Sequence, residues 1–362
     1  MPLRRALDHV EPYRPQRPMH ELQRELGLER MVKLASNEGA FGPLPAAVAA
    51  FEAAAGSLNR YPDAGGMRLR EELARRHDVP LEQVVLGNGA DELIRLCAVA
   101  TLDAGDRAVL PWPSFPSYVV SAASAGAQPV AVPLAGRRFD LDRMLSETQY
   151  GSKLVYLPNP NNPTGVLLDR ADVRRFLDEA PPDVLVVLDE AYAEYADPEP
   201  EGPALLREGR ERLCVLRTFS KVYGLAALRI GYALASPQIA DGLDRVRPIF
   251  NVNQPAQEAA LASLHEGHAI GGRIAHARHA RGALAAALAA AGLDPEPSQA
   301  NFVYADVPGG DSAGLADRLL RRGFIVRELT GFGAPGAIRV TAGTDEENEL
   351  FAKALLQLVA TR

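Results

Sequence analysis

The chain has 362 residues, of which 47% are hydrophobic and 23% are charged, and its formal net charge at pH 7 is −7. This composition is ordinary for a soluble globular protein, and the length favours two domains. The mildly acidic balance provides no general attraction for nucleic acid or an anionic membrane, so we expect neither as a partner.

Residues 1–30 are predicted to form an N-terminal arm. The arm begins rich in Pro and Arg, and "MHELQRELGL" then predicts a short amphipathic helix. The first residues lack the long apolar segment of a secretory signal, and the later Ala-rich stretch "GALAAALAAAGL" is too short to span a bilayer. We therefore expect a cytoplasmic protein.

Residues 31–250 are predicted to form a large α/β domain. From about residue 66, helical segments alternate with short apolar runs such as "QVVLGN", "RAVLPW", "KLVYLPN" and "LCVLRTFSK". This alternation predicts a mostly parallel sheet of the seven-stranded type, covered by helices on both faces. Ligands bind beyond the carboxyl ends of the strands in such sheets, and most of the motifs below fall there.

Residues 251–362 are predicted to form a smaller C-terminal α/β domain. A long helical region, from about Ala256 to Ala291, precedes a strand, a helix, two strands and a final helix. Two cysteines, Cys97 and Cys214, lie in apolar segments and are predicted to be buried thiols in a reducing compartment. We expect no metal site, because no Cys/His cluster has the spacing of metal ligands.

The segment "LGNGADELIRL" predicts a strand, a glycine-containing turn and a helix. The first backbone amides of that helix, at Gly89, Ala90 and Asp91, would be free to bind an anion. The segment is neither a dinucleotide fingerprint nor a P-loop. A plain strand-to-helix junction is the alternative interpretation.

Two further motifs follow buried strands. In "PNPNNPTGVLL", Asn162 could donate its amide to a ring oxygen, or the segment could be a simple Pro/Gly turn. In "VLVVLDEAYAEY", Asp189 could cap a helix, or it could keep the nitrogen of a pyridine cofactor protonated. Tyr192 could reach the same ligand or serve only in packing.

The segment "RTFSKVYGLAALRIGY" places Lys221 in otherwise apolar surroundings. The hydroxyls of Thr218 and Ser220 and the guanidinium of Arg229 could hold one phosphate together with the "GADE" amides. Lys221 would then lie beside the phosphate, where a lysine is suited to form a Schiff base with an aldehyde. A surface lysine is the alternative for this motif alone, but the four motifs together favour the covalent role.

These motifs, in this order, resemble the fold type I aminotransferases that use pyridoxal 5'-phosphate. More narrowly, the chain resembles the histidinol-phosphate aminotransferase family nearly from end to end. The likeness includes "EPYRPQRP", "KLASNE", "NRYPD", "GNGADE", "NNPTG", "LDEAY", "TFSK", "LRIGY", "FNVNQPAQEAAL", "ANFVYADV" and "IRVTAGT". It implies amino transfer from histidinol phosphate to 2-oxoglutarate in histidine biosynthesis.

The resemblance implies a role for each matching position around the cofactor. Lys221 would bind the cofactor covalently and act as general base and acid. Asp189 would pair with the pyridine nitrogen, and Tyr192 and Asn162 would hold the ring 3-oxygen. The cofactor phosphate would be held by Ala90, Asp91, Thr218, Ser220 and Arg229.

The resemblance also implies the substrate contacts and the oligomer. Arg339 would bind the substrate carboxylate or, with Arg327, the phosphate of histidinol phosphate, and Asn37 would lie nearby. Tyr13 resembles an arm tyrosine that covers the substrate. Tyr61 would reach the phosphate in the neighbouring subunit, so the active unit would be a homodimer.

Two segments depart from the family pattern. "PWPSFPSY" places Phe115 where the family often has a tyrosine stacked on the cofactor ring, which preserves stacking but removes a hydroxyl. "SNEGAFGPLP" replaces the commoner "SNENPLGPSP" beside the substrate.

Two other enzyme classes fit the same motifs. An aromatic amino-acid aminotransferase would use the same arginine, and a threonine-phosphate decarboxylase-like lyase would share much of the framework. A regulatory module that binds the cofactor would need a fused DNA-binding domain, for which the chain has no room before the catalytic-like region.

Overall fold

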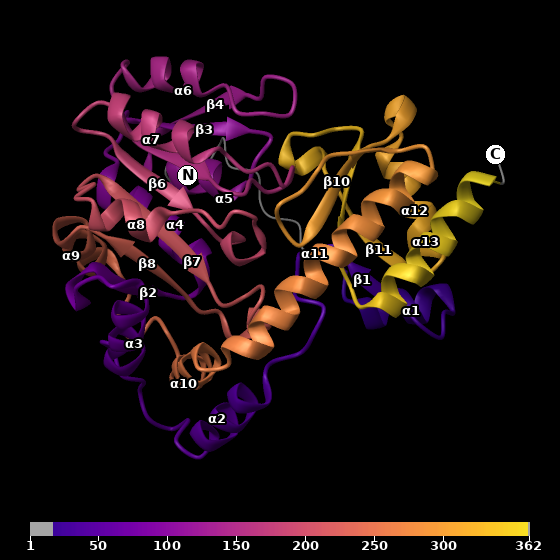
Figure 1. Ribbon diagram of the computed structural model, residues 1–362, viewed down its shortest axis with the longest axis horizontal. Helices are drawn as coiled ribbons and strands as arrows, with labels where there is room; N and C mark the ends of the chain where they lie inside the picture. The colour runs from indigo at the N-terminus through magenta and orange to yellow at the C-terminus, as the bar shows by residue number, and fades with distance from the viewer. Residues whose placement is uncertain (1–16, 361–362) are drawn as a thin grey trace, which may run out of the picture.

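The computed structural model describes residues 17–360 and consists of two parts, each built on one sheet (Figure 1). In the larger part, seven strands lie in the order β2-β8-β7-β6-β5-β3-β4. Among these described strands, β8 alone runs antiparallel to its neighbours. The predicted α/β fold with a mostly parallel seven-stranded sheet is thus confirmed. The strands are β2 (Val84–Gly87), β3 (Arg107–Trp112), β4 (Gln128–Pro133), β5 (Ser152–Pro158), β6 (Leu185–Asp189), β7 (Leu213–Thr218) and β8 (Gly231–Ala235).

Helices cover both faces of the larger sheet. In β5, Val155 and Leu157 face one apolar core, while Leu154 and Tyr156 face the other. Because both faces are buried, the strands read as continuous apolar runs rather than alternating ones. The first core is closed by α3 (Met67–His77), α6 (Leu141–Thr148), α7 (Arg170–Glu179), α8 (Gly202–Arg207) and α10 (Gln254–Leu264), and the second by α4 (Gly89–Thr101), α5 (Ser117–Ala125) and α9 (Pro237–Val246).

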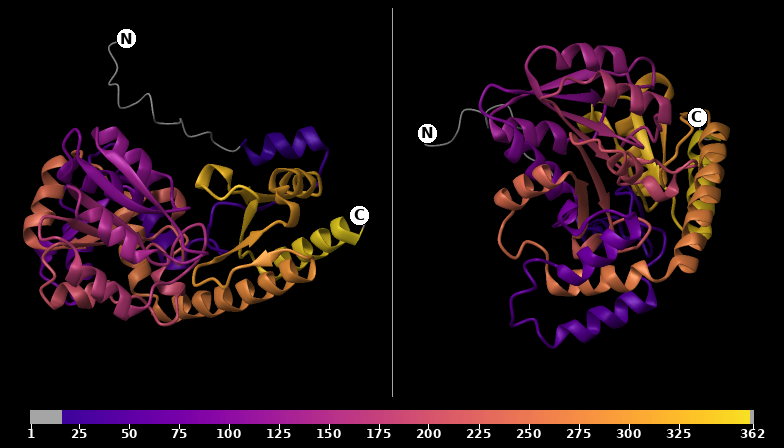
Figure 2. Two further views of the ribbon diagram at one scale, coloured as in Figure 1. Left: turned by 90° about the horizontal axis from the view of Figure 1, so that it is seen from above. Right: turned by 60° about the vertical axis from the view of Figure 1, so that its left-hand side comes forward.

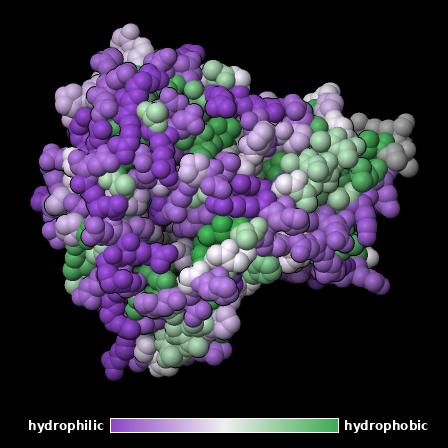
Figure 3. Space-filling view, viewed as in Figure 1, coloured by the Kyte–Doolittle hydropathy of each residue, from purple (hydrophilic) through white to green (hydrophobic). Residues whose placement is uncertain are grey.

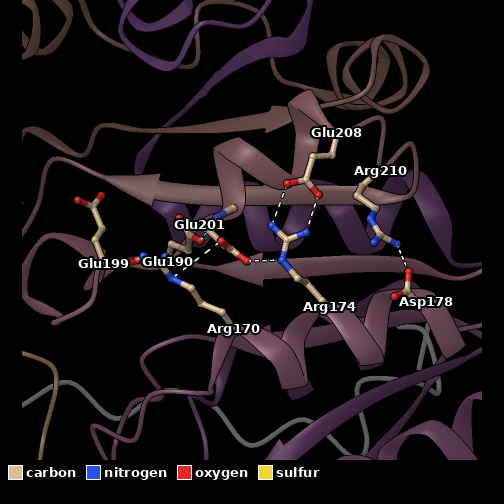
Figure 4. Close-up of polar contacts among 9 residues, drawn as sticks. Arg170, Arg174, Asp178, Glu190, Glu199, Glu201, Glu208 and Arg210 are labelled. Atoms are coloured by element: carbon tan, nitrogen blue, oxygen red, sulfur yellow. Dashed lines mark hydrogen bonds and ion pairs between the residues drawn. The ribbon is translucent and has the colours of Figure 1, made fainter.

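Ion pairs connect α7 to the two ends of α8. Arg174 lies between Glu201 and Glu208, with nitrogen–oxygen distances of 2.7 and 2.6 Å (Figure 4). Arg210 pairs with Asp178 beside them. Exposed pairs contribute only about 0–1 kcal/mol each, so the apolar core beneath them stabilises this layer more than they do.

The smaller part contains a five-stranded sheet in the order β1-β11-β12-β10-β9. Three helices pack on one face of it, and α1 packs on the other through Leu22 and Ile325. The long helix α11 and the C-terminal helix α13 lie side by side along this part (Figure 2). The elements are α1 (Met19–Leu26), β1 (Val32–Leu34), α11 (Gly267–Ala290), β9 (Asp294–Pro295), β10 (Phe302–Asp306), α12 (Ser312–Arg321), β11 (Phe324–Glu328), β12 (Ala337–Thr341) and α13 (Asp345–Ala360).

The structure differs from the predicted domain limits at two places. Strand β1 lies inside the predicted large domain, 31–250, but pairs with β11 of the smaller sheet. Helix α10 lies inside the predicted C-terminal domain, 251–362, but packs against α2 (Pro45–Ala55) on the larger part. The chain therefore crosses between the parts after β1 and again at α11. The first crossing carries residues 36–38 past the site described next.

Candidate active site

A cavity of about 320 Å³ lies between the two parts, beyond the carboxyl ends of β5, β6 and β7. Both parts contribute side chains, so the site is complete only when they pack together. The cavity brings together these predicted residues: Asn37, Ala90, Asp91, Phe115, Asn162, Asp189, Tyr192, Thr218, Ser220, Lys221, Arg229, Arg327 and Arg339. Gly89, also predicted, lies next to the guanidinium of Arg229.

Asp189 is the last residue of β6 and places a buried carboxylate in the cavity. Its Oδ2 accepts a hydrogen bond of 2.7 Å from the Tyr118 hydroxyl, and its Oδ1 accepts one of 3.1 Å from the Ala191 amide. Burial raises the pKa of the Asp189 carboxyl, and these two hydrogen bonds oppose that shift. A cationic ligand group would restore the charge balance at this position.

A buried ion pair lies directly behind Asp189. Glu190, the next residue, accepts two hydrogen bonds from Arg217, at 2.9 and 2.7 Å, and both side chains are almost fully buried. Figure 4 includes Glu190 among the polar contacts on this side of the sheet. The pair joins the end of β6 to the end of β7, and so fixes Asp189 relative to Thr218.

Lys221 follows β7 and is partly buried. Its Nζ lies 3.5 Å from the carbonyl oxygen of Ser36, to which it donates, and 5.4 Å from the centre of the Tyr192 ring. The amine therefore enters the cavity beside Tyr192, held by one long hydrogen bond. Such an amine can reach a ligand carbonyl by a small side-chain rotation.

Tyr192 and Asn37 form a second polar group in the cavity. Asn37 Nδ2 donates to the Tyr192 hydroxyl at 2.9 Å, and the Asn37 backbone amide donates to Thr341 Oγ1 at 2.9 Å. Asn37 adopts a φ of 54°, which an asparagine tolerates better than most residues. Because the Tyr192 oxygen accepts from Asn37, its own proton is available for a ligand oxygen.

Hydroxyls, amides and a guanidinium converge at the first turn of α4. Thr218 Oγ1 and Ser220 Oγ lie 3.0 Å apart, and Arg229 Nη1 lies 3.4 Å from Ser220 Oγ. Gly89 has a φ of +78°, and a Cβ there would lie 2.4 Å from Arg229 Nη2. A Cβ at this position would therefore displace the guanidinium from the place it occupies on this turn. A helix N-terminus with a guanidinium and two hydroxyls suits a phosphate monoester.

The Asp91 side chain does not take part in this group of donors. Its Oδ1 accepts a hydrogen bond from the Ser117 hydroxyl. Asp91 can thus offer a phosphate only its backbone amide, as expected for the first turn of a helix.

Arg327 and Arg339 form a cationic pair on the side of the cavity that belongs to the smaller part. They lie directly opposite each other on β11 and β12. Arg339 is 3% exposed, and it donates from Nη1 to Asn162 Oδ1 and from Nη2 to the Ala35 carbonyl at 2.7 Å. The Nε atoms of both arginines are buried without a hydrogen-bond partner. Such unpaired cationic donors indicate an anion site.

The Arg339 guanidinium is enclosed by two aromatic rings as well. The centres of Phe302 and Phe332 each lie 5.2 Å from its central carbon. Burial, with a smaller contribution from the charge of Arg327, lowers the pKa of Arg339 to about 10. The side chain therefore remains cationic at neutral pH.

Tyr61 does not line this cavity. Its side chain is 80% exposed and stacks on Phe250 with the ring centres 4.4 Å apart. Its predicted role in a neighbouring subunit stays a prediction. Tyr13 lies outside the described residues. Within residues 17–360, no group of His, Cys, Asp and Glu could hold a metal ion, and no helix has the length and apolar character of a membrane span.

Tyr118 and Phe332 are among the residues of the site that the sequence interpretation missed. Tyr118, which bonds to Asp189, stands at the start of α5 and looks like an ordinary core aromatic in "PSYVVSAAS". Phe332, which flanks Arg339, follows a glycine in a short loop. Neither carries a local signal, because each acquires its contact only through the tertiary fold.

Comparisons with known proteins agree with this geometry. The family model described as "Aminotransferase class I and II" matches residues 29–355. The histidinol-phosphate aminotransferase of Symbiobacterium thermophilum is 43% identical over 353 residues, which cover 98% of this chain and 97% of that protein. The solved histidinol-phosphate aminotransferase of Sinorhizobium meliloti, in complex with pyridoxal-5'-phosphate, has a TM-score of 0.90 at 29% identity and covers 99% of this chain and 98% of its own.

The same fold occurs in a lyase. The L-threonine-O-3-phosphate decarboxylase of Porphyromonas gingivalis has a TM-score of 0.81 at 24% identity and covers 91% of this chain and 100% of its own. At that identity the likeness concerns the fold alone, so the reaction must be argued from the site.

Proposed function

The chain belongs to the class I and II aminotransferase family, and we propose that it transfers the amino group of histidinol phosphate to 2-oxoglutarate, with pyridoxal 5'-phosphate as cofactor. The reaction belongs to histidine biosynthesis. The observation that carries the substrate assignment is the opposed pair Arg327 and Arg339, whose Nε atoms are buried and unpaired. The 43% identity to a histidinol-phosphate aminotransferase over nearly the whole chain supports it.

The donors in the cavity match the functional groups of the cofactor. The cluster of Thr218, Ser220 and Arg229 at the first turn of α4 would hold the phosphate. Asp189 would face the pyridine nitrogen, and the Tyr192 proton would serve the ring 3-oxygen. The face of Phe115, which also lines the cavity, would cover the ring.

Pyridoxal 5'-phosphate, when bound, supplies an aldehyde that takes up the amino group and a ring that withdraws electrons from the neighbouring carbon. Asp189, whose two hydrogen bonds oppose the effect of burial on its charge, would hold a proton on the ring nitrogen and so favour that withdrawal. Once the substrate amine has taken its place on the cofactor, Lys221 Nζ would be a free amine that can remove the proton from the substrate Cα and hold it for return. Arg339 orients the substrate from the opposite wall.

The two arginines favour a substrate that carries a phosphate. A carboxylate bears one negative charge and can occupy one guanidinium fork. A phosphate monoester bears nearly two charges and three acceptor oxygens, which match two opposed guanidinium groups. 2-Oxoglutarate offers two carboxylates to the same pair. One cationic wall can therefore serve both half-reactions.

The active unit of the proposal is a homodimer. Exposed apolar side chains on α2, on the loop after it, at the start of α3 and on the loop before α10 support this part, because a soluble chain rarely leaves such a patch uncovered. The outer side of α2 forms an apolar region at the lower edge of Figure 3. The exposed residues are Val48, Phe51, Leu58, Tyr61, Met67, Ile249 and Phe250.

A reducing compartment, the cytoplasm, is the proposed location. Cys97 and Cys214 are both free and buried, with their sulfur atoms 3.9 Å apart. Thiols that lie this close persist as thiols where the surroundings are reducing.

A panel of amino donors tests the proposal. Purified protein with added cofactor and 2-oxoglutarate is assayed with histidinol phosphate, phenylalanine, tyrosine and threonine phosphate. The proposal expects glutamate formation with the highest kcat/KM for histidinol phosphate. A preference for phenylalanine or tyrosine would replace the substrate assignment with an aromatic one, and release of carbon dioxide from threonine phosphate would replace it with a lyase.

A further inference from the structure

We propose that Tyr118 is a positioning residue for the cofactor, acting through Asp189 and Phe115. The inference rests on the proposed function, because it concerns how the same cavity holds pyridoxal 5'-phosphate.

Tyr118 contacts both side chains that would hold the cofactor ring. Its hydroxyl donates to Asp189 Oδ2 at 2.7 Å. Its ring meets the ring of Phe115 edge to face, with centres 5.9 Å apart and planes at 86°. One buried side chain therefore touches the partner of the ring nitrogen and the residue predicted to cover the ring face.

The position of Tyr118 is fixed by close packing. The side chain is 1% exposed and stacks on Tyr156, with the ring centres 4.7 Å apart. Tyr156 is itself fully buried, and its hydroxyl donates to the main-chain carbonyl of Ile94 at 2.9 Å. Packing of this kind restricts the Tyr118 ring to one orientation. The hydroxyl is thereby directed at the carboxylate without further loss of side-chain entropy.

The hydroxyl, rather than the ring alone, is the part that acts on Asp189. A buried carboxylate tends to become neutral unless donors stabilise its charge. Burial and the charge of Asp189 keep the Tyr118 hydroxyl protonated by raising its pKa, so it can serve as a donor throughout the neutral range. A charged Asp189 in turn stabilises a protonated ring nitrogen, which holds the cofactor more tightly and strengthens its electron withdrawal.

Cofactor affinity in a double-mutant cycle tests the inference. Apoprotein of the unchanged chain, Tyr118→Phe, Asp189→Asn and the double variant is titrated with pyridoxal 5'-phosphate, and Kd is read from the absorbance of the bound cofactor. Loss of a hydrogen bond to a charged group predicts a Kd about tenfold higher for Tyr118→Phe. In the Asp189→Asn background the same change is expected to have less than about a twofold effect, since the charge it serves is gone.

Tyr156→Phe is the matched control. It removes an equally buried hydroxyl from the same aromatic stack, but one that bonds to a main-chain carbonyl. We expect its Kd and kcat to stay within about twofold of the unchanged chain, while Tyr118→Phe lowers kcat and leaves KM for the donor nearly unchanged.

Three results would overturn the inference: Tyr118→Phe without effect on Kd, an equal effect in both Asp189 backgrounds, or an equal effect of Tyr156→Phe. Failure of the unchanged chain to bind the cofactor would instead contradict the proposed function. The two failures are therefore separable in one set of titrations.

Discussion

Arg327 and Arg339 lie directly opposite each other on adjacent antiparallel strands, and the Nε of each is buried without a partner. Two like charges at directly opposite positions destabilise a sheet unless a negatively charged group contacts both side chains. The pair is therefore arranged for an anionic ligand rather than for the stability of the free protein. Asn162 joins the pair to the cofactor side of the cavity by accepting from Arg339.

Replacement of Arg339 by lysine should weaken the binding of both substrates and leave the binding of the cofactor nearly unchanged. A lysine keeps a positive charge but loses the fork that contacts Asn162, Ala35 and the ligand. We expect KM for histidinol phosphate and for 2-oxoglutarate to rise roughly 10- to 100-fold, with Kd for pyridoxal 5'-phosphate changed by less than about threefold. Steady-state kinetics and cofactor titration measure these quantities.

The control for this prediction is Arg318→Lys, on the exposed side of α12, where the side chain pairs with Asp311. It should leave both KM values unchanged. A loss of cofactor affinity in Arg339→Lys as large as the loss of substrate affinity would assign Arg339 a structural role instead.

Gly89→Ala should weaken cofactor binding selectively. A Cβ at Gly89 would lie 2.4 Å from Arg229 Nη2, so the guanidinium would have to move from its present place on the first turn of α4. We expect Kd for pyridoxal 5'-phosphate to rise by about tenfold or more, the value of one charge-assisted hydrogen bond. Gly105→Ala is the matched control, because Gly105 also has a positive φ, +95°, but open space around its Cβ position.

Both glycine variants should lose some stability from the positive φ, which a melting curve of the apoprotein will record. Only Gly89→Ala should lose cofactor affinity. Equal Kd values for the two variants would contradict the phosphate site at α4.

Mixing two inactive variants tests the homodimer and Tyr61 together. Lys221→Ala lacks the reactive amine, and Tyr61→Ala lacks the side chain predicted to enter the neighbouring site. In a hybrid dimer, one site would contain the native Lys221 together with the native Tyr61 of the other copy. We expect refolded mixtures to show several times the summed activity of the separate variants, with the effect growing as hybrids form.

A mixture with no gain in activity would mean that Tyr61 acts within its own chain or not at all. Sedimentation of the unchanged protein at the mass of one chain would exclude the dimer directly. The two measurements together separate a wrong residue from a wrong oligomeric state.

His77 should make the protein lose stability in mild acid. Its Nε2 lies 2.8 Å from the Tyr232 hydroxyl, and burial, followed by the charges of Arg217 and Arg76, lowers its pKa to about 3. Between that value and the unfolded value of about 6.5, only the unfolded chain binds the proton. Stability is therefore lost as pH falls below about 6.5, by at most about 2 kcal/mol at pH 5.

Urea unfolding at pH 7.5 and pH 5 checks this contribution. His77→Gln should show a smaller loss between the two pH values than the unchanged protein, whereas His268→Gln, at an exposed position, should show the same loss. Identical losses in all three proteins would mean that His77 does not control acid sensitivity.

Local patterns were sufficient to predict most of the larger sheet. Each parallel strand is a short apolar run between helices, and the chemical motifs stand where those strands end, as at Asp189 and Thr218. The pairing of β1 with β11 could not be predicted, because three residues with one exposed position give no distinct pattern. The first of the two differences in the domain limits, at β1, has this cause.

The site residues also divide into those that a local motif predicts and those whose contacts arise only in the tertiary fold. Those in motifs, such as Lys221 and Arg229, could be predicted, because the chemistry requires these residue types in a recognisable order. Tyr118 could not be, since its hydroxyl meets Asp189 only after α5 packs on the sheet. The prediction for Asp91 concerned its backbone amide, and it stays a prediction; the Asp91 carboxylate accepts a hydrogen bond from Ser117 and so does not compete for that place.

The central claim is that the Lys221 amine binds the cofactor aldehyde covalently. The chain has three other lysines, Lys33, Lys153 and Lys353, so the site of attachment can be read without ambiguity. Holoprotein reduced with borohydride, digested and mapped by mass spectrometry should carry the pyridoxyl mass on Lys221 and on none of the others. A fully loaded protein with that mass on another lysine, or on no lysine, would contradict the account.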